Sequence, residues 1–527
     1  MICKDYMKII KKNTHYKNNK QIVYRFVIII QALCISSSLL SQNKNFYQEF
    51  NFLQRLSPKT NHSSLRPYNE QFNQLSFKDY YIDSSLNQAK LYDFIFKKSV
   101  LDIVDKEVHL QVDPLFNFSF GNQNSNGLYR YYTNTRGFRV LGDLGDKVSF
   151  GTRVYENQIN YPDYLDEVAD DRGVALGIGR SKPFKTYGHD AAIASGYVSF
   201  SPVNDVNLQF GHGRHFFGNG YRSLLLSDYA PDYPYFSGQY KFLDGKIAYK
   251  HISAWMHSLE RSLFSTITAE ALFKQKATSL NMLSFNLNKQ IEFSFFEGVV
   301  HKSYVDSIGK VSPDVSFYLP IFGSSQLVNK QESGINRVYG ASLSSMFKDK
   351  LVLYGQTMFH DQSNWGFQSG LKWLNPFRSV NSYVLVEYNY VKPFSYTVDS
   401  LRIIQSYTHN GHELAHPLGS GFSELVLKTH VEYKKFLFNL QLSKIVKEHV
   451  INSDLGNNIF KPTYSTMPTT LVNEKIFYSY IELGYLLNVQ TQMKLFVNFF
   501  NRKTEGSAER YFTFGFRTNL INNYFDQ

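Results

Sequence analysis

The sequence is almost without cysteine. Its 527 residues contain only Cys3 and Cys34, both near the start of the chain. A chain that loses this segment on export keeps no thiol, and therefore neither a disulfide nor a thiolate zinc site. Long apolar runs are also missing, because no later segment approaches the roughly 18 consecutive apolar residues of a membrane-spanning helix. If the later segments cross a membrane, they must therefore do so as a β-barrel.

Several chemical signatures are absent as well. The basic excess, a formal net charge of +12, is spread along the chain and forms no tract suited to nucleic acid. No phosphate-cradling glycine loop and no G-x-S-x-G elbow occurs. The acidic stretch 153–173 lacks the spacing of a calcium loop, and we expect a solvated loop there. The sequence thus predicts no enzymatic activity, no cofactor and no nucleic-acid partner.

Aromatic residues are abundant. The chain has 45 Phe and 38 Tyr against 3 Trp, while only 43% of residues are hydrophobic and the mean hydropathy is −0.31. High aromatic content with modest hydropathy is typical of a transmembrane β-barrel, whose strands show lipid only on alternate residues and carry aromatic girdles. A soluble all-β protein with tyrosine-rich binding faces would have a similar composition, so composition alone leaves both open.

The N-terminal part has two predicted segments. Residues 1–41 are predicted to be a signal peptide, since basic residues precede the apolar stretch Phe26–Leu40 and polar residues follow it. An uncleaved anchor is the alternative. Residues 42–107 are predicted to be a small helical or irregular periplasmic segment, because apolar residues recur roughly at helical spacing. These residues are Leu91, Ile95, Val100, Ile103 and Val104.

From residue 108 onward, apolar and polar residues alternate. The alternation is regular in the segments 148–154, 493–500 and 511–517, and period two is the signal of a strand. Such runs number about 18 up to residue 520. We expect the aromatic-rich run ending in Asn523–Gln527 to close a barrel.

The connections between these runs come in two lengths. Short turns are expected at 142–147, 201–205, 286–290, 347–350, 432–435 and 488–492, and long polar loops at 156–190, 214–235, 303–335, 393–420 and 448–474. Short turns at one end and long loops at the other are the arrangement of outer-membrane barrels, with the short turns periplasmic. The prediction is an all-β fold in which residues 108–527 form an antiparallel outer-membrane barrel of about 18 strands. A soluble β-propeller or large sandwich is the alternative.

The segment Phe210–Tyr235 is the densest in chemistry. Its glycines permit an unusual backbone path, and aromatic, basic and acidic side chains surround them. This mixture suits carbohydrate, because aromatic faces stack on sugar rings while charged side chains hydrogen-bond hydroxyls or carboxylates. The candidates for contacting a glycan at the extracellular end are Arg214, His215, Tyr221, Arg222 and Asp228. The alternative is a loop packed into the lumen as a plug.

The stretch "HELAHPLGSGF" (His412–Phe422) contains the zinc-protease pattern H-E-x-x-H. That chemistry needs both histidines on one helical face. Pro417 directly follows His416 and disfavours helical dihedrals there, and Phe422 occupies the position of a third ligand. We therefore predict no metal site and no catalytic residue, and add His412 and His416 to the candidate glycan contacts.

Five segments carry a resemblance to a known family. They are "DPLFNFSFG" (Asp113–Gly121), "NTRGFRVLGDLGDKVSF" (Asn134–Phe150), "ASGYVSFSP" (Ala194–Pro202), "FGHGRHFFGNGYRSLLLSD" (Phe210–Asp228) and "YTHNGHELAHPLGSGF" (Tyr407–Phe422). With these segments the chain resembles the Wzi-like capsule assembly family, in particular its Bacteroidetes branch, which includes the gliding motility protein RemB. The run "GYRSLLLSD" is the most specific of them.

The resemblance implies an 18-stranded outer-membrane barrel plugged on its periplasmic side by helices. It also implies a non-enzymatic surface lectin that holds capsular or other exopolysaccharide in the outer membrane. A role in gliding motility, with motility or adhesin proteins as partners, is implied by the branch alone. The enterobacterial members have a tryptophan-rich run where this chain has His215–Gly218, so their glycan specificity is not carried over. The alternative is a structural accessory of adhesin or motility machinery without glycan affinity of its own.

Overall fold

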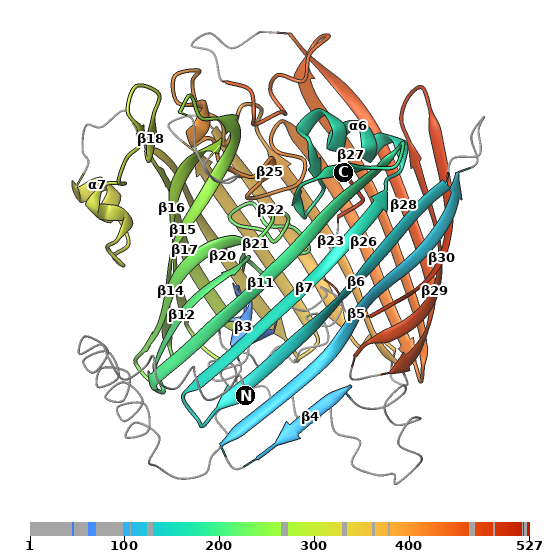
Figure 1. Ribbon diagram of the computed structural model, residues 1–527, viewed down its shortest axis with the longest axis horizontal. Helices are drawn as coiled ribbons and strands as arrows, with labels where there is room; N and C mark the ends of the chain where they lie inside the picture. Colours follow the sequence, from blue (N-terminus) through green and yellow to red (C-terminus); the bar gives the residue numbers. More distant parts are fainter. Residues whose placement is uncertain are drawn as a thin grey trace, which may run out of the picture.

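The computed structural model describes residues 45–46, 62–69, 99–105, 107–123, 130–264, 272–328, 335–360, 364–377, 380–462, 470–488, 491–518, 520 and 524–527. Its main element is a closed antiparallel barrel of 18 strands (Figure 1). The barrel closes where β30 (Ala508–Arg517) pairs with β5 (Val108–Gln123), with Tyr511 opposite Gln123 and Arg517 opposite Asn117. The predicted fold class and strand number are confirmed.

The other sixteen strands follow one another around the wall in chain order. They are β6 (Arg130–Leu144), β7 (Val148–Asn160), β11 (Gly188–Val203), β12 (Val206–Gly213), β14 (Tyr233–Phe242), β15 (Ile247–Arg261), β16 (Phe273–Asn286), β17 (Ile291–His301), β20 (Asn336–Phe347), β21 (Leu351–His360), β22 (Asn364–Leu374), β23 (Asn381–Val391), β26 (Phe422–Tyr433), β27 (Phe436–Val450), β28 (Leu471–Asn488) and β29 (Met493–Lys503).

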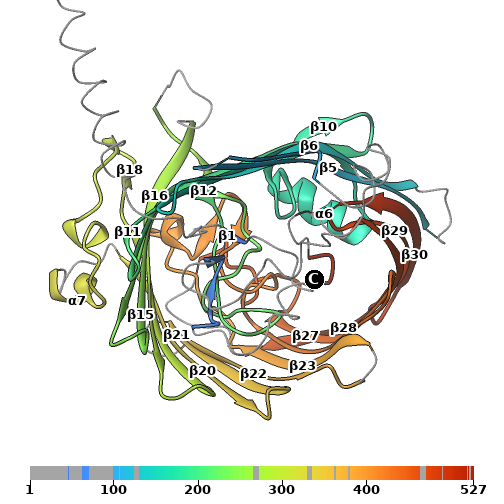
Figure 2. The same cartoon turned by 90° about the horizontal axis from the view of Figure 1, so that it is seen from below.

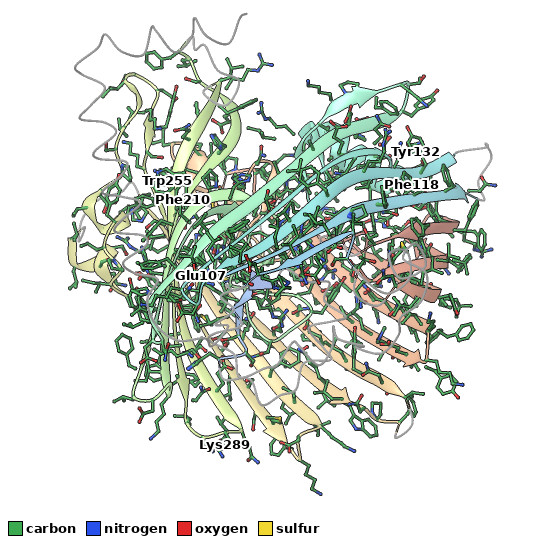
Figure 3. All side chains as sticks on the ribbon, turned by 60° about the horizontal axis from the view of Figure 1, so that its bottom comes forward. Glu107, Phe118, Tyr132, Phe210, Trp255 and Lys289 are labelled. Carbon is green, nitrogen blue, oxygen red and sulfur yellow. The ribbon has the colours of Figure 1, made fainter. Side chains whose placement is uncertain are left out.

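The two faces of the wall follow the predicted alternation. On β29, Leu495, Val497 and Phe499 are 40–49% exposed, whereas Phe496 and Phe500 are only 5% exposed. The first set points outward, where a membrane protein meets lipid, and the second points into the lumen. Figure 3 shows the side chains along the wall and labels Phe210, an exposed outward residue of β12.

The connections also follow the prediction. Every predicted short turn joins two strands at one end of the barrel, here called the turn end, and the five long loops lie at the other, the loop end (Figure 1). The tight turns place Asp349 and Lys434 at positive φ, of 54° and 56°, as such turns require. Among the fully described connections, the sequence analysis missed the turn 243–246 between β14 and β15 and the connection 504–507 between β29 and β30.

The acidic stretch 153–173 is not a loop, so that part of the expectation was wrong, although Glu156, Glu167, Asp170 and Asp171 are exposed to solvent as expected. After β7 it forms helix α6 (Asp163–Arg172) near the loop end (Figure 1). Asp163 and Asp166 lie in its first turn, where carboxylates stabilise a helix N-terminus, and Gly173 ends it in the left-handed conformation. Leu165 is fully buried, so packing against the barrel adds to the local signals.

The described residues 302–328 of the loop after β17 lie against the outer face of the wall, where Figure 2 shows α7 (Ser324–Val328). Glu297 lies on the outward face of β17, two residues after the exposed Phe295, yet it is fully buried. Its carboxylate accepts hydrogen bonds from the Gly323 amide at 2.8 Å and the Ser325 hydroxyl at 3.1 Å. The loop therefore satisfies a charge that hydrocarbon could not accommodate.

The N-terminal segment differs from the prediction where it is described. Residues 101–104, part of the segment predicted to be helical or irregular, form strand β4 (Leu101–Val104), which pairs with β5 near the turn end. Strand β2 (Leu65–Arg66) pairs with β13 (Phe216–Phe217). Strands β1 (Asn45–Phe46) and β3 (Tyr68–Asn69) pair with each other. The described part of 42–107 is thus extended rather than helical, while the predicted signal peptide lies outside the described residues.

The end of the sequence also differs. Strand β30 stops at Arg517, and the last four residues lie inside the barrel rather than on its wall (Figure 2). We call Tyr524–Gln527 the tail segment. Its Tyr524 and Asp526 side chains bond to residues of loop 214–232, so the barrel is closed by residues 508–517 alone. Among the described residues, no helix is long and apolar enough to cross a membrane.

Candidate functional site

One side of the lumen is filled by two long loops, 214–232 and 393–421, which we call the plug. Loop 214–232 leaves β12 and turns inward, as its leucine run demands: Leu224, Leu225 and Leu226 have no exposed surface. The Leu224 and Leu225 carbonyls accept hydrogen bonds from the hydroxyls of Tyr396 at 2.6 Å and Tyr407 at 2.9 Å. The two loops therefore support each other (Figure 2).

Side chains of the wall satisfy the backbone of the plug. Gln356 on β21 accepts from the Leu224 amide at 2.9 Å and donates to the Phe217 carbonyl at 2.9 Å. Glu387 on β23 accepts from the amides of Tyr221 at 2.7 Å and Arg222 at 3.0 Å. A buried loop needs such partners, because its peptide groups have no helix or sheet to bond to.

The glycines of loop 214–232 permit this close approach. A Cβ added to Gly220 would lie 2.5 Å from the Glu387 carboxylate and 2.6 Å from the Arg222 carbonyl. Gly218 has a φ of 142°, which L side chains rarely adopt, and an added Cβ would collide with the Gln356 amide. These glycines therefore serve the fit of the plug against the wall.

Arg222 lies at the centre of a buried ionic cluster. Its guanidinium is 3.0 Å from Glu424 on β26 and 2.8 Å from Asp526 of the tail segment, with no exposed side-chain surface. Its ring neighbours are Tyr221 at 4.6 Å and Tyr524 at 5.0 Å. Burial alone would lower the pKa of Arg222, but the carboxylates of Asp526 and Glu424 outweigh it and hold that pKa well above its ordinary value.

Three more candidate residues belong to loop 214–232. Arg214 donates to Asp232 at 2.7 Å and to the Asp228 carbonyl at 3.0 Å. The Asp228 carboxylate accepts a 2.5 Å hydrogen bond from the Tyr524 hydroxyl. His215 lies apart, with its Nδ1 3.2 Å from the Tyr233 hydroxyl, and burial lowers its pKa well below the ordinary value.

The H-E-x-x-H segment is not a helix. His412 and Glu413 form strand β25, which pairs with β24 (Thr408–His409) in a hairpin inside the barrel. His412 accepts from the Gly177 amide at 2.9 Å, and Glu413 binds Arg172 of α6 with two bonds of 3.1 Å.

His416 follows in a turn and bonds Glu424 at 2.8 Å. The two histidines therefore face different partners, which is not the arrangement of a zinc protease. Among the described residues, no group of three histidine, cysteine or acidic side chains could hold a metal ion.

The structure thus brings most of the seven candidates together, but inside the barrel. Arg214, His215, Tyr221, Arg222, His412 and His416 are at most 4% exposed, and Asp228 is partly buried. The expected position at the extracellular surface is therefore corrected, because the leucine run draws the loop inward. Contact with a glycan stays a prediction for these residues, and the interactions described here give them a role in packing.

The other side of the lumen contains a cavity of about 170 Å³ that the sequence analysis did not foresee. It lies against β5, β6 and β26–β30 and borders the tail segment at Phe525 and Asp526. Its lining mixes rings with polar groups: Tyr131, Tyr478, Tyr480, Phe496, Phe500, Asn117, Asn439, Gln441, Glu482, Asn498, Thr513 and Arg517. The available signal was the polar residues at inward positions of strands otherwise rich in aromatics.

Comparisons with known proteins concern the fold. No family model and no curated protein matches the chain. Among solved structures, the chain is similar to Wzi, described as an outer-membrane protein involved in group 1 capsule assembly in Escherichia coli and as a carbohydrate-binding β-barrel. The TM-score is 0.56 at 12% identity, covering 91% of this chain and 100% of that one. This likeness establishes a shared 18-stranded barrel fold.

Weaker likenesses exist to other barrels. Acinetobacter baumannii OccAB2 matches with a TM-score of 0.43 at 11% identity, over 78% of this chain and 98% of that one. Pseudomonas aeruginosa OpdQ matches with a TM-score of 0.41 at 8% identity, over 79% and 97%. Similarities with TM-scores this low support no further statement about the chain.

Proposed function

We propose that the protein resides in the outer membrane and binds or organises surface polysaccharide as a non-enzymatic, lectin-like barrel. The observation that carries this proposal is a closed barrel whose own loops fill one side of the lumen. A barrel filled in this way is suited to presenting loops at the surface rather than to conducting solutes. The similarity of fold to a barrel described as carbohydrate-binding supports the same function.

The motifs that resemble the branch with RemB extend this proposal. They support a role in gliding motility, through the handling of surface polysaccharide or adhesins. Under this proposal the partners are surface polysaccharide, outer-membrane lipid and motility or adhesin proteins.

An exposed tip at the loop end offers a contact for glycan. Residues 182–187 form β10 (Lys182–Phe184) and the turn that leads into β11. Tyr187 is 63% exposed, and Lys185 lies 5.2 Å from the ring of Phe184. Aromatic faces beside a cation suit sugar rings and acidic sugars.

The test is capture of polysaccharide from the protein's own cell surface by the detergent-solubilised barrel, with and without chelator. We expect saturable capture that survives the chelator and weakens about fivefold in Phe184→Ala/Tyr187→Ala, the effect of one lost stacking contact. Tyr433→Ala is the matched control, since Tyr433 is 52% exposed at the turn end. It should bind like the wild type.

Folding is checked in each variant by the heat-shifted gel mobility of the barrel. A folded barrel that captures no polysaccharide, yet co-purifies with adhesin or motility proteins, would overturn the proposal in favour of a structural accessory. Steady conductance in planar bilayers would overturn it in favour of a porin.

A further inference from the structure

We infer that the lumen cavity is a binding site for one uncharged sugar unit. This inference rests on the proposed function and deepens it, because it gives part of the glycan a place inside the barrel. The cavity of about 170 Å³ lies on the side of the lumen that the plug leaves unfilled.

The floor of the site is a row of inward residues that lie opposite one another on neighbouring strands. Asn439 on β27 is paired with Glu482 on β28, Glu482 with Asn498 on β29, and Asn498 with Thr513 on β30. Each of the four residues lines the cavity. The row therefore presents hydrogen-bonding groups from four strands of a rigid wall, which suits recognition of several hydroxyls at once.

The charged groups of the site already have partners, including Lys428, which donates to Gln441 at 2.9 Å. Glu482 is bound by Arg517 at 2.7 Å and Lys494 at 3.2 Å, and Asp526 is bound by Arg222 at 2.8 Å. A charged ligand would have to compete with these pairs. An uncharged one would need only the hydrogen-bonding groups beside them.

Some of those groups have no partner within the protein. The Asn117 Oδ1, Asn498 Oδ1 and Thr513 Oγ1 atoms are buried without a hydrogen bond, and Thr513 is 1% exposed. A buried polar atom without a partner is costly, and proteins usually provide one. All three side chains line the cavity, so a polyol bound there lies beside them.

Aromatic rings complete the site. Phe500 lies 6.2 Å from Tyr478 in a stacked arrangement and 6.5 Å from Tyr131 in an edge arrangement. These rings line the cavity beside the polar row. Apolar C–H faces combined with hydroxyl edges are the two sides of a sugar ring, whereas an anion or a hydrocarbon would use only one of them.

The experiment measures binding of neutral hexoses by saturation-transfer NMR and calorimetry. The probes are glucose, galactose and mannose, with glucuronate as the charged counterpart. The protein is held in a detergent without a sugar head group, because a maltoside would compete. We expect the wild type to bind at least one hexose saturably and more tightly than glucuronate.

Asn498→Phe fills the cavity from the wall and should weaken hexose binding at least tenfold. Thr513→Val removes one hydroxyl and should weaken binding about threefold, less than the effect of a typical hydrogen bond. Thr278→Val is the matched control, because Thr278 is fully buried, its hydroxyl also lacks a partner, and it lies on β16 away from the cavity. Thr513→Val keeps the test decisive if Asn498→Phe does not fold.

Two results would overturn the inference: a folded wild type that binds no hexose, or folded Asn498→Phe and Thr513→Val that bind as tightly as the wild type. Polysaccharide capture is measured on the same samples. If polysaccharide is still captured but no hexose binds, the cavity is not a sugar site and the proposed function is retained. Hexose binding that depends on Asn498, without capture of polysaccharide, supports the cavity and overturns the function.

Discussion

The two sides of the lumen differ although one continuous wall surrounds both. Toward β15 and β16, the inward residues Ile252, Leu280 and Met282 are apolar and fully buried under the plug. Toward β28 and β29, the inward positions carry Glu482 and Asn498, and a cavity remains. The strands have the same hydrogen bonding and the same alternation on both sides, so the wall does not cause the difference.

The difference shows that the inward face selects what fills the barrel. An apolar inward face gains free energy only if apolar side chains cover it, and the leucine run of loop 214–232 provides that cover. A polar inward face gains nothing from such a cover and retains space for water or a polar ligand. The Arg222 cluster lies between the two sides, because Arg222 belongs to the plug and Asp526 borders the cavity.

The largest effect is expected at that boundary. Arg222→Ala leaves Glu424 and Asp526 buried without their cation and should lower the free energy of unfolding by about 3–5 kcal/mol. Denaturant titration in lipid vesicles, read by gel mobility, measures the loss. The exposed Arg510→Ala is the control and should change stability by less than about 0.5 kcal/mol. Equal stabilities of the two variants would show that the cluster does not hold plug and tail segment together.

The same leucine-to-alanine substitution should lower the free energy of unfolding by different amounts on the two sides of the lumen. Leu225→Ala removes a fully buried side chain from the plug core and should cost about 3 kcal/mol. Leu520→Ala removes the same atoms from a residue that borders the cavity and should cost about 2 kcal/mol, because part of its surface already faces empty space. The same titration compares them. A cost that is equal or reversed would contradict the division into a filled and a hollow side.

Acid should weaken the filled side. Burial lowers the pKa of His412 from 6.5 to about 3, so His412 stays neutral in the folded barrel. Above pH 6.5, His412 is neutral in both the folded and the unfolded protein, so it does not reduce stability there. Between pH 6.5 and 3 only the unfolded state binds it, so stability falls by up to about 1.4 kcal/mol per pH unit as the pH drops. Burial lowers the pKa of His416 as well, in the same sense.

Unfolding titrations between pH 7 and pH 4.5 measure this dependence. His412→Gln should flatten the curve relative to the wild type. A pH dependence that His412→Gln does not change would assign the acid sensitivity to other groups.

The smallest effect is expected for the two threonines. Thr513→Val and Thr278→Val each replace a hydroxyl that has no hydrogen-bond partner, one on each side of the lumen. Since no bond is lost, both should change the free energy of unfolding by less than about 0.5 kcal/mol in the absence of sugar. Added hexose should stabilise Thr278→Val more than Thr513→Val if the cavity binds it. Equal stabilisation of both would place the sugar elsewhere.

Most of the wall could be predicted from the sequence because its signals are local. Alternation sets the face of each residue, and a one-residue slip would turn the outward-facing Leu495 and Phe499 into the lumen. Turn lengths then separate the two ends. At residues 101–104, predicted to be helical or irregular, pairing with β5 overrides a weak helical spacing of apolar residues and forms β4.

The sequence indicated part of the arrangement of the candidate site. The dense chemistry of residues 210–235 marked a special loop that holds five of the seven candidate residues, and His416 meets one of them, Arg222, at Glu424. What the residues do there was not visible, because Glu387, Glu424 and Asp526 reach them from positions 165, 202 and 304 residues away in the chain. A local sequence pattern cannot show contacts between residues so far apart in the chain.

By itself, the sequence determined the all-β class, the alternation of the strands and the two lengths of their connections, since each depends on neighbouring residues. The tertiary structure alone decided that the glycine-rich loop turns inward, that the tail segment enters the lumen and that a polar cavity remains beside it. These features depend on which inward faces oppose each other across the barrel. That is a matter of three-dimensional packing and electrostatics between residues far apart in the chain.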